Sequence, residues 1–291
     1  MAGPARPRRS VLFMPGSNAR ALEKARTLPA DALIFDLEDA VAPAQKPEAR
    51  GRIAATLASG GYGRRELVVR VNALATQWAK DDLAAAAQMK ADAVLLPKVE
   101  SAETVRRAEA ALAAAGAPTL ALWCMLETPL GILHAEAIAA ASPRLAALVM
   151  GTADLAKDLR AQETPGRQPL LTALSLGLLA ARAYGLAALD GIHPDVADEE
   201  GFARSCRDGR ALGFDGKTLI HPKTIAVANA VFAPSEDELA WARRVIAAHA
   251  DAVAAGQGVT VLEGRLVERL HVEDAQRIVA LADAIAALAE H

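Results

Sequence analysis

Leu120-Ala-Leu-Trp-Cys-Met-Leu-Glu-Thr128 is a short apolar run that ends in a carboxylate, and Pro129 follows it directly. A run of this length is typical of a strand that is buried on both faces, as in a parallel sheet. The stretch Leu145-Ala-Ala-Leu-Val-Met-Gly-Thr-Ala-Asp154 repeats the pattern one helix later. If the two strands lie side by side and parallel, Glu127 and Asp154 emerge at the same edge and can bind one cation.

Similar apolar runs recur along the chain, and helical patterns separate them. The predicted strands cover residues 11–14, 32–35, 66–72, 93–96, 120–127, 145–154, 187–189 and 217–220. The predicted helices between them include residues 19–27, 46–59, 81–89, 102–115, 130–140 and 170–184. This order predicts an α/β fold of the (β/α)8 TIM barrel type. An open doubly wound sheet is the alternative fold, but no glycine-rich fingerprint follows the first strand.

The last part of the chain has a different pattern. We expect a barrel domain over residues 1–232 and a C-terminal helical extension over residues 233–291. The extension is predicted to hold helices at 235–255 and 272–288 and a hairpin around Glu263-Gly264. Such an appendage is expected to act as a lid or as a subunit contact.

Composition excludes several classes of function. The chain has 291 residues, so it can form one large core, and its formal net charge of −3 gives no reason to expect a nucleic-acid or membrane partner. Its start is basic but lacks the apolar segment of a secretory signal, and no apolar run is long enough to span a membrane. The only cysteines, Cys124 and Cys206, fit no metal-binding spacing. We therefore expect a cytoplasmic protein with reduced thiols.

The acids Glu127 and Asp154 are the first candidate site. Two carboxylates without a histidine or cysteine partner favour a hard cation, Mg²⁺ or Mn²⁺. The alternative is that both are solvated strand ends or helix caps. Their matching positions after neighbouring strands favour the metal site.

Arg70 is the second candidate, because a charge within a strand is costly unless something pairs with it. Its guanidinium group can hold a substrate carboxylate by two hydrogen bonds, or it can form a structural ion pair with Asp36 or Glu38. Lys98, after the fourth strand, could in principle form a Schiff base with a carbonyl substrate. The metal carboxylates make this alternative unnecessary. Together these residues predict a site for an oxo acid, where a cation would stabilise an enolate.

Several motifs in order along the chain resemble the citrate lyase beta subunit-like proteins of the HpcH/HpaI aldolase family. The motifs are Ser10-Val-Leu-Phe-Met-Pro-Gly-Ser-Asn18, Asp36-Leu-Glu-Asp-Ala-Val41, Arg70-Val-Asn72, Leu96-Pro-Lys-Val-Glu100, Glu127-Thr128, Gly151-Thr-Ala-Asp154, Gly213-Phe-Asp-Gly-Lys217 and Ile220-His-Pro222. Citrate lyase subunits, malyl-CoA lyases and malyl-CoA thioesterases share most of these motifs. The resemblance therefore implies a family without selecting a substrate.

The resemblance also implies roles for individual residues. Glu127 and Asp154 match the Mg²⁺ ligands, Arg70 matches the residue that holds the oxo-acid carboxylate, and Glu38 matches an active-site acid. Arg20, Lys24 and Asp36 lie where the family contacts coenzyme A. Relatives are usually trimers or hexamers in which the C-terminal segment closes over a site of a neighbouring subunit. Where that segment often reads Asp-Gly-Lys-Met-Ile-Asp, this chain has Glu263-Gly-Arg-Leu-Val-Glu268, so its final acid is one methylene longer.

These observations predict a Mg²⁺-dependent lyase of the citrate lyase beta subunit type. It would reversibly cleave a 3-hydroxyacyl-CoA into an acyl-CoA and a short oxo acid, with Glu268 as an acid/base. A thioesterase of malyl-CoA-type substrates is the enzymatic alternative. A non-catalytic subunit of a larger lyase complex is the alternative from another class. The expected partners are therefore small molecules and further copies of this chain.

Overall fold

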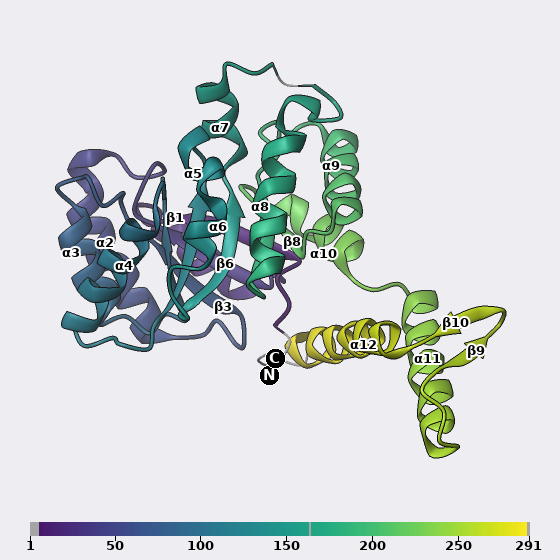
Figure 1. Ribbon diagram of the computed structural model, residues 1–291. Coiled ribbons are helices and arrows are strands. Elements are labelled where there is room, and N and C mark those ends of the chain that lie inside the picture. The colour runs from purple at the N-terminus through teal and green to yellow at the C-terminus, as the bar shows by residue number, and fades with distance from the viewer. Residues whose placement is uncertain (1–5, 163, 290–291) are drawn as a thin grey trace. The chain divides into compact units, whose positions relative to one another are not determined.

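The computed structural model describes residues 6–162 and 164–289. The strands of its main sheet are β1 (Ser10–Pro15), β2 (Ala32–Asp36), β3 (Glu66–Arg70), β4 (Ala93–Leu96), β5 (Ala121–Leu126), β6 (Leu145–Met150), β7 (Ala187–Asp190) and β8 (Gly216–Leu219). Each strand pairs in parallel with the next along the chain, and β8 pairs with β1, so the sheet closes into a barrel (Figure 1). The predicted (β/α)8 barrel is confirmed.

Helices follow the strands and cover the outside of the barrel (Figure 1). They are α1 (Ala19–Lys24), α2 (Lys46–Ser59), α3 (Ala79–Ala86), α4 (Ala102–Ala114), α5 (Pro129–Leu133), α6 (Ala135–Ala139), α7 (Thr152–Leu159), α8 (Leu171–Ala183), α9 (Glu199–Leu212) and α10 (Ile225–Phe232). Short 3-10 helices lie at η1 (Ala25–Thr27), η2 (Pro43–Gln45), η3 (Gln168–Leu170) and η4 (Pro222–Thr224).

The barrel strands are buried on both faces, which explains their uninterrupted apolar sequences. One face fills the barrel interior, where Trp123 packs with Ile34, Val68 and Leu95. The other face packs under the helices in a second, larger hydrophobic cluster. This double burial leaves the polar side chains of the strands to the ends of the barrel.

Two predicted elements differ most from the structure. The predicted strand 145–154 was too long, because β6 ends at Met150 and Asp154 lies in the first turn of α7. An acidic residue in the first turn is favourable, since the helix dipole is positive there. The predicted helix 130–140 is divided at His134 into α5 and α6. The His134 ring lies within hydrogen-bond distance of the Glu100 carbonyl oxygen at this break.

The contacts divide the chain into two compact units, of which one is Arg8–Phe232 and the other contains residues 233–289. The second unit consists of α11 (Glu236–Ala254), the antiparallel strands β9 (Thr260–Leu262) and β10 (Arg265–Val267), and α12 (Arg269–Ala289). Glu263 and Gly264 join the two strands with φ angles of 51° and 77°. This turn has the left-handed backbone that two-residue hairpins require. A separate small core of valine and alanine side chains holds the unit together.

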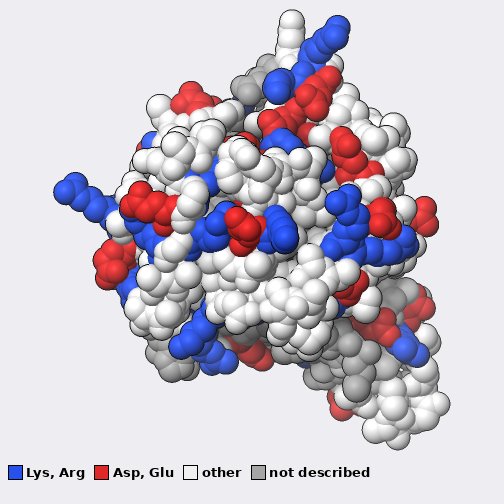
Figure 2. Space-filling model, turned by 90° about the vertical axis from the view of Figure 1, so that its left-hand side faces the viewer, with Lys and Arg blue, Asp and Glu red and all other residues white. Residues whose placement is uncertain are grey.

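The surface carries charges of both signs. Lys, Arg, Asp and Glu side chains are interspersed on the face in Figure 2, without an extended region of one sign. Within residues 6–162 and 164–289, no helix has the length and apolar character needed to cross a membrane. Both cysteines are buried and unpaired.

Candidate active site at the carboxyl end of the barrel

Four of the candidate residues meet at a cavity of about 340 Å³ at the carboxyl ends of the barrel strands. Asp36, Arg70, Glu127 and Asp154 line it, together with apolar side chains that include Phe13 and Met125. This is the end of a (β/α)8 barrel at which the loops after the strands build active sites. Residues that are 118 positions apart in the sequence, Asp36 and Asp154, thereby share one cavity.

Arg70 and Asp36 are neighbours because their strands pair in register at these two positions. The Arg70 Nε and Nη2 atoms donate to the two Asp36 carboxylate oxygens at 2.7 Å, and Nη1 lies 2.7 Å from Glu38 Oε2. Burial alone would lower the pKa of Arg70, but the carboxylates of Asp36 and Glu38 outweigh it and raise that pKa. Arg70 therefore forms the structural ion pair that was the alternative prediction. A guanidinium group has more donors than these three contacts use, so a substrate carboxylate can still bind to it.

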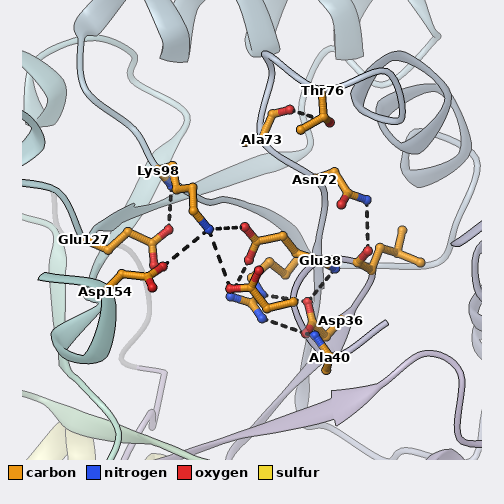
Figure 3. A network of polar contacts seen from close by, with 12 residues as sticks. Asp36, Glu38, Ala40, Asn72, Ala73, Thr76, Lys98, Glu127 and Asp154 are labelled. Carbon is orange, nitrogen blue, oxygen red and sulfur yellow. Dashed lines mark hydrogen bonds and ion pairs between the residues drawn. The ribbon is translucent and has the colours of Figure 1, made fainter. Parts of the chain in front are cut away.

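Asp36 orders the loop that follows β2. Its carboxylate also accepts the backbone N–H groups of Glu38 at 2.9 Å and Ala40 at 3.1 Å (Figure 3). The side chain is fully buried. A direct contact of this carboxylate with coenzyme A would have to compete with these bonds, so the contact stays a prediction.

Lys46 was not predicted to belong to the site. Its buried ammonium donates to the carbonyl oxygens of Leu37 and Glu38 at 2.9 and 2.8 Å and to Asn72 Oδ1 at 2.7 Å. Burial lowers the pKa of Lys46, although the carboxylates nearby act in the opposite direction. Lys46 thus fixes the backbone that carries Glu38. No periodicity or spacing in the sequence distinguishes this lysine from the exposed ones.

Glu38 lies between two cations. Its Oε1 atom accepts from Lys98 Nζ at 2.5 Å, and its other oxygen faces Arg70. The pKa of Glu38 is nevertheless raised, because its burial outweighs the effects of Arg70 and Lys98. Lys98 Nζ also lies 3.4 Å from Asp154 Oδ2 and 3.6 Å from Asp39 Oδ2. Figure 3 shows its side chain between Glu38 and the pair Glu127–Asp154.

Glu127 is held by its backbone surroundings. Its Oε1 atom accepts the backbone N–H of Lys98 at 2.7 Å, and the residue is 3% exposed. Gly151 allows this position, because a Cβ atom at Gly151 would overlap the Glu127 side chain. Burial raises the pKa of Glu127 to about 8, against the opposing effect of Lys98. Because burial is the largest cause, the ionised carboxylate lacks the stabilisation that water would provide, and a bound cation would supply it.

Glu127 and Asp154 point toward the same space (Figure 3). Their oxygens are the donor type that a hard cation prefers, and Mg²⁺ usually keeps further positions for water and substrate oxygens. Among the residues that the structure describes, no group of three or more His, Cys, Asp or Glu side chains is arranged to hold a metal. The residues present thus fit a cation that takes two protein carboxylates and completes its shell with small molecules.

The remaining candidates lie outside this cluster. Arg20 and Lys24 are exposed on α1, one helical turn apart, and available to an anionic ligand. Glu268 belongs to the second unit, where its backbone N–H lies 3.2 Å from His271 Nδ1. Two neighbouring arginines bind other residues, since Arg265 stacks on Trp241 and Arg269 pairs with Glu273. The role of Glu268 as an acid/base stays a prediction.

Comparison with known proteins identifies relatives in both sequence and structure. The family model described as HpcH/HpaI aldolase/citrate lyase matches residues 9–222. A (3S)-malyl-CoA thioesterase of Cereibacter sphaeroides is 51% identical over 99% of both chains. The citrate lyase subunit beta of Leuconostoc mesenteroides is 40% identical, and the match covers 95% of this chain and 94% of that protein. A crystal structure of CitE from Mycobacterium tuberculosis in complex with magnesium, acetoacetate and coenzyme A has a TM-score of 0.76 and 36% identity, and the match covers 97% of this chain and 98% of that one. The chain therefore belongs to the HpcH/HpaI aldolase/citrate lyase family.

Proposed function

We propose that this protein is a Mg²⁺-dependent lyase that reversibly cleaves a 3-hydroxyacyl-CoA of the malyl-CoA or citryl-CoA type. The products would be an acyl-CoA and a short oxo acid. The observation that carries the proposal is the pair Glu127 and Asp154, which faces one cavity together with Arg70. The CitE structure that resembles this chain contains magnesium, an oxo acid and coenzyme A, and this supports the same ligand classes here.

The residues of the cavity suit this reaction. Cleavage breaks the bond between the hydroxyl-bearing carbon and the carbon next to the thioester, and the electron pair remains on the thioester side as an enolate. When bound by Glu127 and Asp154, Mg²⁺ would polarise the oxygen of the oxo acid and stabilise negative charge. Arg70 would orient the substrate carboxylate, and Glu38 would keep Arg70 and Lys98 in place as an acid of the site. The hydroxyl group would lose its proton as its carbon becomes the carbonyl carbon of the oxo acid, and a proton would be added to the enolate carbon. Glu268 would serve as the acid/base for this proton transfer.

The substrate also carries a coenzyme A group. Arg20 and Lys24 form a small cationic surface on α1, directly after β1 at the same end of the barrel. Phosphate groups bind well to such side chains. We assign these two residues to coenzyme A, whereas Asp36 would contribute through the loop that it orders.

Thioester hydrolysis is the second candidate function. The relative with 51% identity is named a (3S)-malyl-CoA thioesterase, and this favours a malyl-CoA-type substrate whichever bond breaks. In that reaction water attacks the thioester carbonyl, and the hydroxy acid leaves intact together with free coenzyme A.

Product analysis separates the two reactions. Purified protein is incubated with (3S)-malyl-CoA and Mg²⁺, glyoxylate is trapped with phenylhydrazine, and free thiol is measured with a disulfide reagent. A lyase forms glyoxylate without free thiol, whereas a thioesterase forms free thiol without glyoxylate. Activity of the isolated chain would exclude the non-catalytic subunit. Failure to convert malyl-CoA, citramalyl-CoA and citryl-CoA would contradict the proposed enzyme.

We also propose that the protein is a homo-oligomer of the trimer or hexamer type. Leu130 and Leu133 on α5, and Leu176 and Leu179 on α8, are large apolar side chains exposed on two helices that contact one another. Covering such a surface with a further copy would remove it from water. Sedimentation of the wild type should therefore show a trimer or hexamer, and Leu133→Glu with Leu179→Glu should dissociate it. A monomeric wild type would contradict this proposal.

A further inference from the structure

Lys98 has an unusual backbone conformation directly after β4. Its φ angle is 50°, in the left-handed region that residues with a Cβ atom seldom adopt. This turn directs the backbone N–H to Glu127 on the next strand and sends the side chain across the mouth of the barrel. Strained backbone of this kind is often retained at functional sites. One residue thus contacts the carboxylates of three separate segments.

The Lys98 ammonium lies beside a carboxylate that we assign to the metal ion. It lies 3.4 Å from Asp154 Oδ2, and the same residue's backbone N–H holds Glu127. A divalent cation bound to both carboxylates would compete with the ammonium for Asp154. It would also be repelled by a positive charge only a few ångströms away. Glu38 and Asp39 provide the ammonium with other partners on the opposite side.

We propose that Lys98 is a positioning residue that acts as an internal counter-ion at the metal site. In the metal-free protein the ammonium is bonded to Glu38 and also balances the charge of Asp154, and metal binding breaks its contact with Asp154 so that only Glu38 and Asp39 remain as its partners. Lys98 therefore reduces the repulsion between the carboxylates of Glu38, Asp39 and Asp154, but it also weakens the affinity of the site for the metal ion. Because Glu38 also contacts Arg70, the displacement links the metal to the group that orients the substrate carboxylate. This inference rests on the metal site of the proposed function.

Direct measurement of metal binding without substrate tests the inference. Free Mn²⁺ is measured by electron paramagnetic resonance during titration of wild type, Lys98→Met, Lys98→Gln and Lys98→Arg. All three variants keep the backbone N–H that binds Glu127. The two neutral variants should bind Mn²⁺ roughly tenfold more tightly, which is the order of effect that a neighbouring charge has on a partly exposed site. Lys98→Arg, which keeps the charge, should bind like the wild type.

Two controls separate the possible failures. Lys90→Met removes an exposed lysine that precedes β4, at the opposite end of the barrel, and should not change the affinity. Glu127→Gln should weaken Mn²⁺ binding strongly. Suppose that Glu127→Gln no longer binds Mn²⁺, but Lys98→Met and Lys98→Gln bind it no more tightly than the wild type. This result would contradict the role of Lys98 and would still support the metal site. Binding that Glu127→Gln leaves unchanged would overturn the metal site and this inference together.

Discussion

Gly151 shows how a single missing side chain determines the position of a functional one. Its backbone lies against Glu127, so Gly151→Ala must displace that carboxylate. We expect the substitution to weaken Mn²⁺ binding by at least about tenfold, since a displaced ligand loses its contact with the metal. Titration followed by electron paramagnetic resonance measures this change.

Gly51→Ala is the matched control for this prediction. Gly51 lies within α2, and a Cβ atom there meets no other atom within 4 Å. Alanine should therefore leave Mn²⁺ affinity unchanged and raise the free energy of unfolding by up to about 1 kcal/mol, because it favours helix more than glycine does. Equal Mn²⁺ affinities of Gly151→Ala and Gly51→Ala would contradict the assigned position of Glu127.

Arg70 serves both stability and substrate binding in this account. Arg70→Lys keeps the charge but cannot reproduce the pair of hydrogen bonds to Asp36. We expect a loss of roughly 1–3 kcal/mol in the free energy of unfolding, because the buried Asp36 carboxylate loses a partner. Urea denaturation measures this loss. In the condensation direction, the KM for the oxo acid should also rise. An unchanged KM would mean that Arg70 serves only in the structural ion pair and does not bind the substrate.

The sequence predicts the charged residues of the site better than their contacts. Asp36, Arg70 and Glu127 are recognisable because each stands at the end of an apolar run. Their proximity follows from the barrel, whose parallel strands bring such residues to one edge. The contacts of Lys46 and Lys98 depend on the course of loops and, for Lys98, on one left-handed residue. No local pattern encodes these features.

At the scale of elements, the apolar runs predict most strands closely, and the errors occur where one element changes into another. Residues 93–96 form a strand as predicted, whereas the predicted strand at 145–154 ends at Met150. The residues Gly151-Thr-Ala before Asp154 carry no charge, so the sequence does not show that the strand ends at Met150. The helix that follows nevertheless keeps Asp154 at the mouth of the barrel.

Glu268, the proposed acid/base, lies between the last strand of the hairpin, β10, and the helix α12. We expect Glu268→Ala to abolish carbon–carbon cleavage while Mn²⁺ binding remains, since the residue is not a metal ligand in this account. Glu268→Asp should keep part of the activity because it retains the carboxylate. Turnover of (3S)-malyl-CoA and Mn²⁺ titration measure the two effects. Full lyase activity of Glu268→Ala would leave Glu38 as the acid of the site.

For the whole molecule, the sequence separates the barrel from the C-terminal segment because their patterns differ. The structure divides the chain after Phe232 into two units, each with its own hydrophobic core. The proposed action of Glu268 in a neighbouring subunit predicts complementation. Mixed subunits of Glu268→Ala and Glu127→Gln should regain activity that neither variant has alone, because some sites would then combine both intact residues. If the mixtures are as inactive as the separate variants, Glu268 does not act in a neighbouring subunit. Either Glu268 and Glu127 of one site then belong to the same chain, or Glu268 is not the acid/base.

The central claim is that a divalent cation held by Glu127 and Asp154 is required to convert a malyl-CoA-type thioester. The most direct measurement is the loss of (3S)-malyl-CoA, followed by chromatography, with chelator-treated protein before and after Mg²⁺ is restored. We predict no turnover with chelator, full recovery with Mg²⁺, and no recovery in Glu127→Gln or Asp154→Asn. Full turnover by the chelated wild type would contradict the claim.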